Sequence, residues 1–178
     1  MAKKTNIDLI KSILADKYID PIQNKLVEDK SKDAVKPFVM ERNVISHHDI
    51  NEYVLYRFDP DNEDIFPFFK RATGLKKICD YILFVEQGRS LYILLIEMKL
   101  GNISSRKQLD ASELFVNYIL NSAERVNCKI SDYHIRKIRI CDRKSRGKRQ
   151  TKPKDLEYDQ NYLDYNTVRD FRIKELLF

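Results

Sequence analysis

The fold of this chain is decided by residues 78–99, which read ICDYILFVEQGRSLYILLIEMK. Two β-rich runs, 78–86 and 91–99, are separated by the short polar turn Gln-Gly-Arg-Ser, an arrangement typical of a β-hairpin. The second run is apolar at every position from Leu91 to Ile96, as expected of a central strand covered on both faces. The stretch therefore predicts two neighbouring strands in the middle of a sheet.

The register of this hairpin predicts a pair of carboxylates. If Gly88 and Arg89 are the two turn residues, Asp80 lies directly opposite Glu97 on the same face of the sheet. Lys99 lies two residues beyond Glu97 and shares that face. A turn shifted by one residue still leaves the two acids as diagonal neighbours. The hairpin therefore brings two acids and one lysine together.

Such a pair of acids has a physical requirement. Two carboxylates side by side on a largely buried surface repel each other, and they stay ionised only with a cation or another positive group nearby. Oxygen-rich sites of this kind suit Mg²⁺ or Mn²⁺. A metal held there can bind a phosphate oxygen and lower the pKa of a bound water. Lys99 could orient that water or stabilise charge developing on the phosphate.

Asp80 followed by Glu97-Met98-Lys99 resembles the signature of the PD-(D/E)XK nuclease superfamily. Cys79 stands where that signature names a proline. The resemblance implies an α/β fold of the restriction-endonuclease-like kind, with a mixed central sheet flanked by helices and with the metal-binding acids on adjacent strands. It covers residues 78–99, and the order strand, strand, helix, strand extends it over 100–140.

The resemblance also implies roles for individual residues. The two acids of the motif would bind Mg²⁺ or Mn²⁺, and Lys99 would assist catalysis. Many members add an acid from an upstream helix, for which Glu28 and Glu52 are both candidates and neither is preferred. Gln108, near the start of the following helix, could reach the site or could simply begin that helix. The alternative reading of the motif itself is a solvated strand end, which the apolar strand leading into Glu97 disfavours.

The rest of the chain predicts one domain over 1–178, with an N-terminal helical part at 1–45, a catalytic core at 65–141 and a basic loop at 142–154. Thr5 can cap a helix over 5–18, and Asp20 can cap a second one that buries Ile22, Leu26 and Val27. Before the hairpin we expect a strand or short helix near Glu52–Phe58 and an edge strand over Ile65–Lys70. After the hairpin we expect a helix from Ser104 or Ser105 to about residue 123, followed by a strand over Tyr133–Cys141 and a strand or helix over Val168–Phe178. The residues of this helix expected to face inward are Ala111, Phe115, Tyr118 and Ile119.

The charge of the chain suits an anionic partner. Lys and Arg number 33 against 27 Asp and Glu, a net charge of +6. The three cysteines match no zinc motif, and no apolar run is long enough to span a bilayer, so we expect a cytoplasmic protein without a membrane partner. The residues expected to contact nucleic acid are Arg136, Lys137, Arg139, Arg143, Lys144, Arg146, Lys148 and Arg149.

Together these features predict a metal-dependent nuclease that hydrolyses phosphodiester bonds, with DNA favoured over RNA as the partner. One alternative is a non-catalytic nucleic-acid-binding module on the same fold, whose binding would be salt-sensitive and indifferent to replacement of Asp80 or Glu97. Another is a protein-interaction module such as an inhibitor or immunity protein, which would show no nucleic-acid affinity at moderate salt. Homodimer formation is left open.

Overall fold

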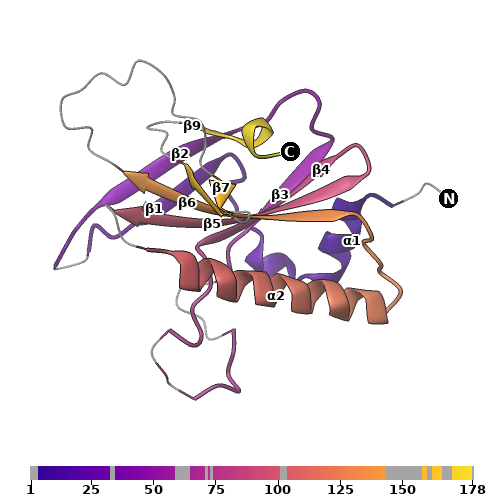
Figure 1. Ribbon diagram of the computed structural model, residues 1–178, viewed down its shortest axis with the longest axis horizontal. Coiled ribbons are helices and arrows are strands. Elements are labelled where there is room, and N and C mark those ends of the chain that lie inside the picture. Colours follow the sequence, from indigo (N-terminus) through magenta and orange to yellow (C-terminus); the bar gives the residue numbers. More distant parts are fainter. Residues whose placement is uncertain are drawn as a thin grey trace.

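The computed structural model describes residues 4–32, 35–58, 65–70, 72, 74–100, 104–142, 158–159, 162–165 and 170–177. Within these ranges the chain is a mixed α/β structure with two α-helices, two short 3₁₀ helices and two sheets (Figure 1). The helices are α1 (Asn6–Ile13), η1 (Asp16–Tyr18), α2 (Arg106–Arg125) and η2 (Ile173–Leu176). The strands are β1 (Lys25–Asp29), β2 (Val39–Ile45), β3 (Glu52–Tyr56), β4 (Tyr81–Gln87), β5 (Ser90–Leu100), β6 (Tyr133–Asp142), β7 (Tyr158–Asp159), β8 (Tyr162–Tyr165) and β9 (Asp170–Arg172).

The larger sheet has the strand order β3-β4-β5-β6-β8-β7. The pairs β3–β4, β4–β5 and β7–β8 are antiparallel, whereas β5–β6 and β6–β8 are parallel. Helix α2 connects β5 to β6, as a parallel pair requires a crossover connection. The smaller sheet, β1-β2-β9, lies over the opposite face of the larger sheet from α1 and α2 (Figure 1).

Strands β4 and β5 are buried on both faces, as their apolar sequence predicts. Ile93 and Leu95 of β5 pack in a cluster with Leu109 of α2, on the helical side of the sheet. Leu94 and Ile96 point the other way and belong to a second cluster, which includes Leu26, Phe171 and Leu176. The period of two along a strand therefore builds two cores, one on each face.

The N-terminal part is less helical than its sequence predicts. Thr5 caps α1 in a capping box with Asp8, as expected, but the helix ends at Ile13 rather than at residue 18. The helix expected from Asp20 is wrong: the carboxylate of Asp20 accepts a hydrogen bond from the Ile22 N–H in a turn, and the chain continues as β1. Alternate residues of β1 are buried because it pairs with β2 and packs on the larger sheet. Of the described residues up to 45, only those of α1 and η1 are helical, and the later ones form β1 and β2.

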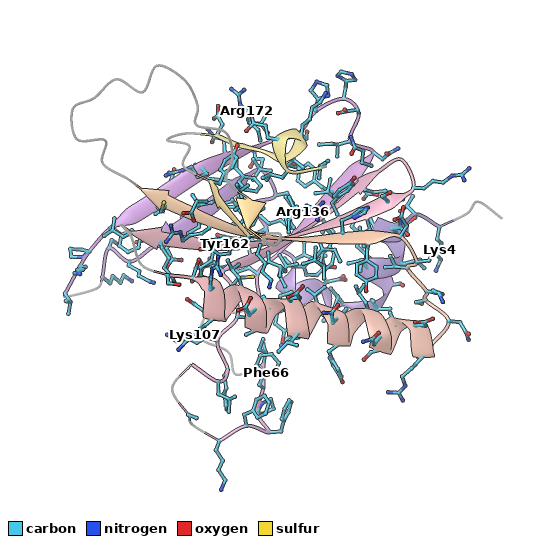
Figure 2. All side chains as sticks on the ribbon, in the orientation of Figure 1. Lys4, Phe66, Lys107, Arg136, Tyr162 and Arg172 are labelled. Carbon is cyan, nitrogen blue, oxygen red and sulfur yellow. The ribbon has the colours of Figure 1, made fainter. Side chains whose placement is uncertain are left out.

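The segment before the hairpin also differs in part. Residues 52–56 form strand β3 rather than a short helix, and β2 was not expected. Residues 65–70 form turns, so the edge strand expected there is wrong. Phe66 instead lies beneath α2, with its ring centroid 5.5 Å from that of Phe115 (Figure 2).

The elements after the hairpin follow the sequence closely. Helix α2 and strand β6 agree with their predicted bounds to within about two residues. Ile119 is buried as predicted, but Tyr118 is exposed, so the inward face of α2 is rotated towards Leu109, Ser112 and Val116. The chain ends on the core through β9 and η2. No helix within the described residues combines the length and apolar character needed to cross a membrane.

Candidate active site

The hairpin has the predicted register. Gln87 pairs with Ser90 and Tyr81 pairs with Ile96, and Gly88 takes the positive φ of 64° that the tight turn needs. Asp80 directly precedes β4, and Glu97 is the next residue of β5 after Ile96. The two carboxylates therefore meet at the end of the sheet farthest from the turn.

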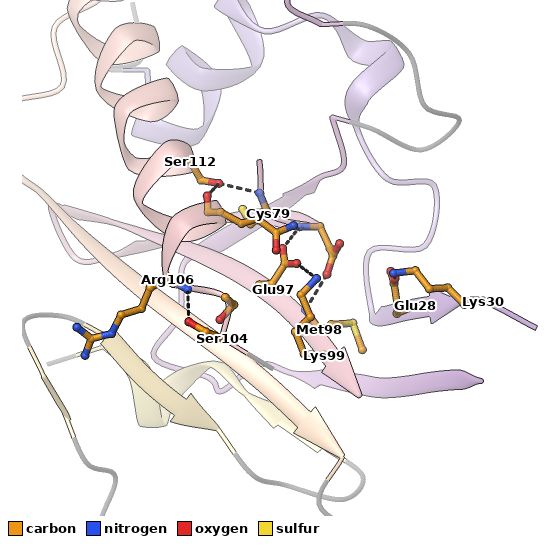
Figure 3. A network of polar contacts seen from close by, with 12 residues as sticks. Glu28, Lys30, Cys79, Glu97, Met98, Lys99, Ser104, Arg106 and Ser112 are labelled. Carbon is orange, nitrogen blue, oxygen red and sulfur yellow. Dashed lines mark hydrogen bonds and ion pairs between the residues drawn. The ribbon is translucent and has the colours of Figure 1, made fainter. Parts of the chain in front are cut away.

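Asp80 and Glu97 bind each other's strand (Figure 3). The backbone N–H of Asp80 donates to Oε2 of Glu97 over 3.2 Å, and the N–H of Met98 donates to Oδ2 of Asp80 over 2.7 Å. Each carboxylate is thus fixed by the backbone beside the other one. The geometry predicted from the hairpin is confirmed, and both acids are rigidly positioned.

Lys99 is the positive group of this pair. Its Nζ forms an ion pair with Oε1 of Glu97, whose side chain is completely buried. Apart from this ion pair, Oε1 accepts no conventional hydrogen bond from the part of the chain that the structure describes. A buried carboxylate oxygen with one cationic contact and no neutral donor is suited to binding a further cation.

The pKa values of both acids are raised. Burial is the main cause for Asp80, and the charges of Glu97 and Glu28 add to it, so that its pKa rises to about 7. Burial also raises the pKa of Glu97, against the opposing effect of Lys99. Without a bound cation, the folded protein therefore holds a proton on this pair at a pH at which free carboxylic acids are ionised.

This shift predicts that the metal-free protein becomes less stable as the pH rises from 5 to 8. The pKa of Asp80 is higher in the folded state than in the unfolded chain, so the stabilisation from its protonation is lost as the pH passes through about 7. Asp80→Asn should flatten this dependence. Thermal unfolding in EDTA between pH 5 and 8 measures how the stability of each protein depends on pH. An equal dependence for the wild type and Asp80→Asn would contradict the prediction. Subtracting the stability of the variant from that of the wild type at each pH cancels the contribution of the histidines, which both proteins share.

Of the two upstream acids, the structure brings Glu28 to the pair. Glu28 lies on β1, is 6% exposed, and raises the pKa of both Asp80 and Glu97 through its charge. Glu52 pairs with Glu86, at the other end of β4 from Asp80, and its carboxylate forms an ion pair with Lys11 over 2.6 Å. Glu52 is therefore not near the carboxylate pair.

A serine of α2 fixes the backbone just before Asp80. The N–H of Cys79 donates to Oγ of Ser112 over 2.7 Å, and this hydroxyl donates to the backbone carbonyl of Gln108, also over 2.7 Å (Figure 3). Gln108 thus contacts the network through its backbone. No motif in the sequence points to Ser112, which is marked only by its position on the buried face of α2.

The donor chemistry of the pair fits a hard divalent cation. Among the described residues, no group of three or more His, Cys, Asp or Glu side chains is arranged to hold a metal ion. A site of two carboxylates still suits Mg²⁺, which usually binds one or two carboxylates together with waters and substrate phosphates. The residues that would hold the ion are Asp80 and Glu97, and Glu28 lies at the edge of this site.

The basic residues of β6 have partners within the chain. Nζ of Lys137 lies 2.7 Å from both Oδ1 of Asp110 and Oε2 of Glu113 on α2. Arg139 is 6% exposed and forms a two-pronged ion pair with Asp164 of β8. Both side chains already have carboxylate partners within the fold, which disfavours their predicted phosphate contacts.

The remaining basic residues predicted to contact nucleic acid are Arg136 of β6 and those of the basic loop at 142–154. Arg136 donates to the backbone carbonyl of Ile135 over 3.1 Å. Five basic residues predicted to contact nucleic acid lie outside the described residues, so for them the prediction stands as made: Arg143, Lys144, Arg146, Lys148 and Arg149.

Comparison of the chain with protein-family models, curated proteins and solved structures finds no match in any of the three.

Proposed function

We propose that this protein is a metal-dependent nuclease of the PD-(D/E)XK type that hydrolyses phosphodiester bonds, with DNA as its substrate. One observation carries the proposal: Asp80 and Glu97 are held side by side by reciprocal backbone hydrogen bonds, with Lys99 ion-paired to Glu97. The element order β4, β5, α2, β6 also agrees with the strand, strand, helix, strand order of that superfamily, which supports a restriction-endonuclease-like fold.

In this proposal each residue has a distinct task. Asp80 and Glu97 bind Mg²⁺ or Mn²⁺ through carboxylate oxygens that the sheet has already positioned. When bound, the ion would supply Lewis-acid stabilisation of charge on the phosphate. Lys99 orients the attacking water or stabilises the charge that develops on the phosphate oxygens. Because the sheet fixes these groups beforehand, little reorganisation is needed during the reaction.

The first test is calorimetric Mn²⁺ binding by the wild type and by Asp80→Asn, followed by cleavage of plasmid and single-stranded DNA with the same samples. We expect Mn²⁺ binding and cleavage by the wild type, and the loss of both in the variant, because the carboxylate charge is removed from the site. Plasmid nicking or linearisation would identify an endonuclease. A wild type that neither binds Mn²⁺ nor cleaves would contradict the proposal.

One observation favours the protein-interaction alternative. Leu114 and Tyr118 lie four residues apart on α2, and their exposed fractions are 72% and 69%. Phe68, two residues after Phe66, is 75% exposed. Exposed apolar side chains of this size are typical of contact surfaces. The experiment above separates the two functions, because a protein-interaction module would bind neither Mn²⁺ nor nucleic acid at moderate salt.

A further inference from the structure

A second lysine lies beside the carboxylates, and the proposed reaction does not use it. Lys30 directly follows β1, and its Nζ lies 2.7 Å from Oε1 of Glu28. The side chain of Glu28 is 8% exposed, whereas that of Lys30 is 45% exposed. A buried carboxylate thus anchors the ammonium group of a half-exposed side chain. Figure 3 shows this pair at the end of β1, with Glu28 on the strand and Lys30 just after it, across the site from α2.

The position of this lysine is fixed by the docking of β1. The hydroxyl of Tyr81, the residue after Asp80, donates to the carbonyl of Val27 over 2.7 Å and accepts from its N–H over 3.0 Å. The backbone of Lys30 is bonded in both directions to Phe38, which directly precedes β2. The end of β1 is therefore held against the start of β4, where the carboxylate pair lies.

The charges of the site reach Lys30. Its pKa is raised chiefly by the hydrogen bond to Glu28, and the charges of Asp80 and Glu97 contribute further. With all three carboxylates ionised, as cation binding would require, the group of Glu28, Asp80, Glu97, Lys30 and Lys99 carries one negative charge in excess. One divalent cation would turn this into one positive charge, which equals in size the single negative charge of a phosphodiester.

The two lysines differ in exposure. The side chain of Lys99 is 16% exposed and is bound to a fully buried carboxylate, so it can serve only the reacting centre. Among the described residues, the Nζ of Lys30 contacts Oε1 of Glu28 and the ring of Phe38, whose centroid is 5.9 Å away, and because a ring contact occupies no hydrogen-bond acceptor, N–H donors remain for a ligand. Lys30 therefore has the position and the free donors of a substrate-binding group.

We propose that Lys30 binds a non-bridging phosphate oxygen of the nucleic acid at the rim of the site, with Glu28 as the residue that positions it. This inference rests on the proposed nuclease function. It assigns a phosphate contact to a residue outside the carboxylate motif and outside the basic loop, and it gives Glu28 a role that does not depend on direct metal binding.

The test compares Lys30→Met with Lys25→Met. Lys25 begins the same strand, about 17 Å away along an extended chain, and its Nζ pairs with Oε2 of Glu41 over 3.2 Å. Both variants lose one positive charge, at the first residue of β1 or directly after its last residue, so only the position differs. The probes are a fluorescein-labelled 20-base-pair duplex and the corresponding single strand, with Ca²⁺ in place of Mg²⁺ and a gel to verify that the DNA stays intact.

We expect Lys30→Met to weaken binding about tenfold and to reduce the slope of log K against log salt by about one. Under turnover with Mn²⁺, KM should rise by a similar factor while kcat stays within about twofold, and Mn²⁺ affinity should not fall, because a phosphate contact acts on substrate binding. Lys25→Met should change each quantity by less than about twofold.

Three outcomes would overturn the inference. If Lys30→Met binds DNA like the wild type while the wild type cleaves, Lys30 has no phosphate contact and the nuclease proposal stands. If kcat falls with KM unchanged, Lys30 does not serve substrate binding. If the wild type neither binds Mn²⁺ nor cleaves, both proposals fail together. Thermal unfolding of each variant verifies that the fold is intact.

Discussion

Replacing Glu97 with Gln is expected to lower metal-dependent cleavage at least about a hundredfold while leaving the fold intact. Removal of one preorganised charge-stabilising group in an active site typically costs about 10² to 10³ in rate. Glutamine keeps the shape of the side chain, and its carbonyl can still accept the hydrogen bond from the N–H of Asp80. The loss would therefore come from the missing charge rather than from a disrupted sheet.

The control for this variant is Glu52→Gln. It makes the same chemical change on an acid of the same sheet, but at the other end of β4 and in an exposed ion pair with Lys11. We expect Glu52→Gln to retain wild-type cleavage and Mn²⁺ affinity. The measurements are initial cleavage rates in Mg²⁺ and calorimetric Mn²⁺ binding. Full activity of Glu97→Gln would remove the main support for the nuclease proposal.

Replacing Arg139 with Ala is expected to destabilise the protein by about 2 to 3 kcal/mol. Removing one partner of a buried ion pair costs about 3 to 5 kcal/mol, because the remaining charge is left without compensation. Arg139 is 6% exposed, but the side chain of Asp164 is 32% exposed and can regain some water, so we expect a smaller loss. Urea denaturation followed by circular dichroism measures the free energy of unfolding.

Lys137→Ala is the matched control for this second prediction. Lys137 lies on the same strand and also pairs with carboxylates, but the side chains of Asp110 and Glu113 are 61% and 37% exposed, and pairs that water reaches contribute up to about 1 kcal/mol. A cost for Arg139→Ala no larger than that for Lys137→Ala would show that the buried pair does not stabilise the fold. A large loss of DNA affinity in a folded Arg139→Ala would instead restore its predicted phosphate contact.

The carboxylate pair could be predicted from the sequence because its geometry is local. A two-residue turn and the period of two along each strand are enough to place Asp80 opposite Glu97, and Lys99 on the same face. The apolar run of β5 likewise indicates burial on both faces, which the two core clusters confirm. These features depend only on residues within about twenty positions of one another.

The position of β1 could not be predicted in the same way. Its apolar residues, together with the capping signal at Asp20, are compatible with a helix as well as with a strand. Pairing with β2 and docking on Tyr81 decide in favour of the strand, because extended backbone N–H and C=O groups need partners that only these distant segments supply. Lys30 and Glu28 reach the site only as a result of this pairing.

The hairpin, its buried strands and the three charged residues of the motif therefore follow from the amino-acid order alone, because turn geometry and side-chain alternation act over short distances. The tertiary structure decided which upstream acid joins them and which basic residues are already neutralised. Glu28 rather than Glu52 lies beside Asp80, and Lys137 and Arg139 bind carboxylates of α2 and β8. Those outcomes depend on contacts between segments far apart in the chain, where charge and burial are set by packing rather than by local pattern.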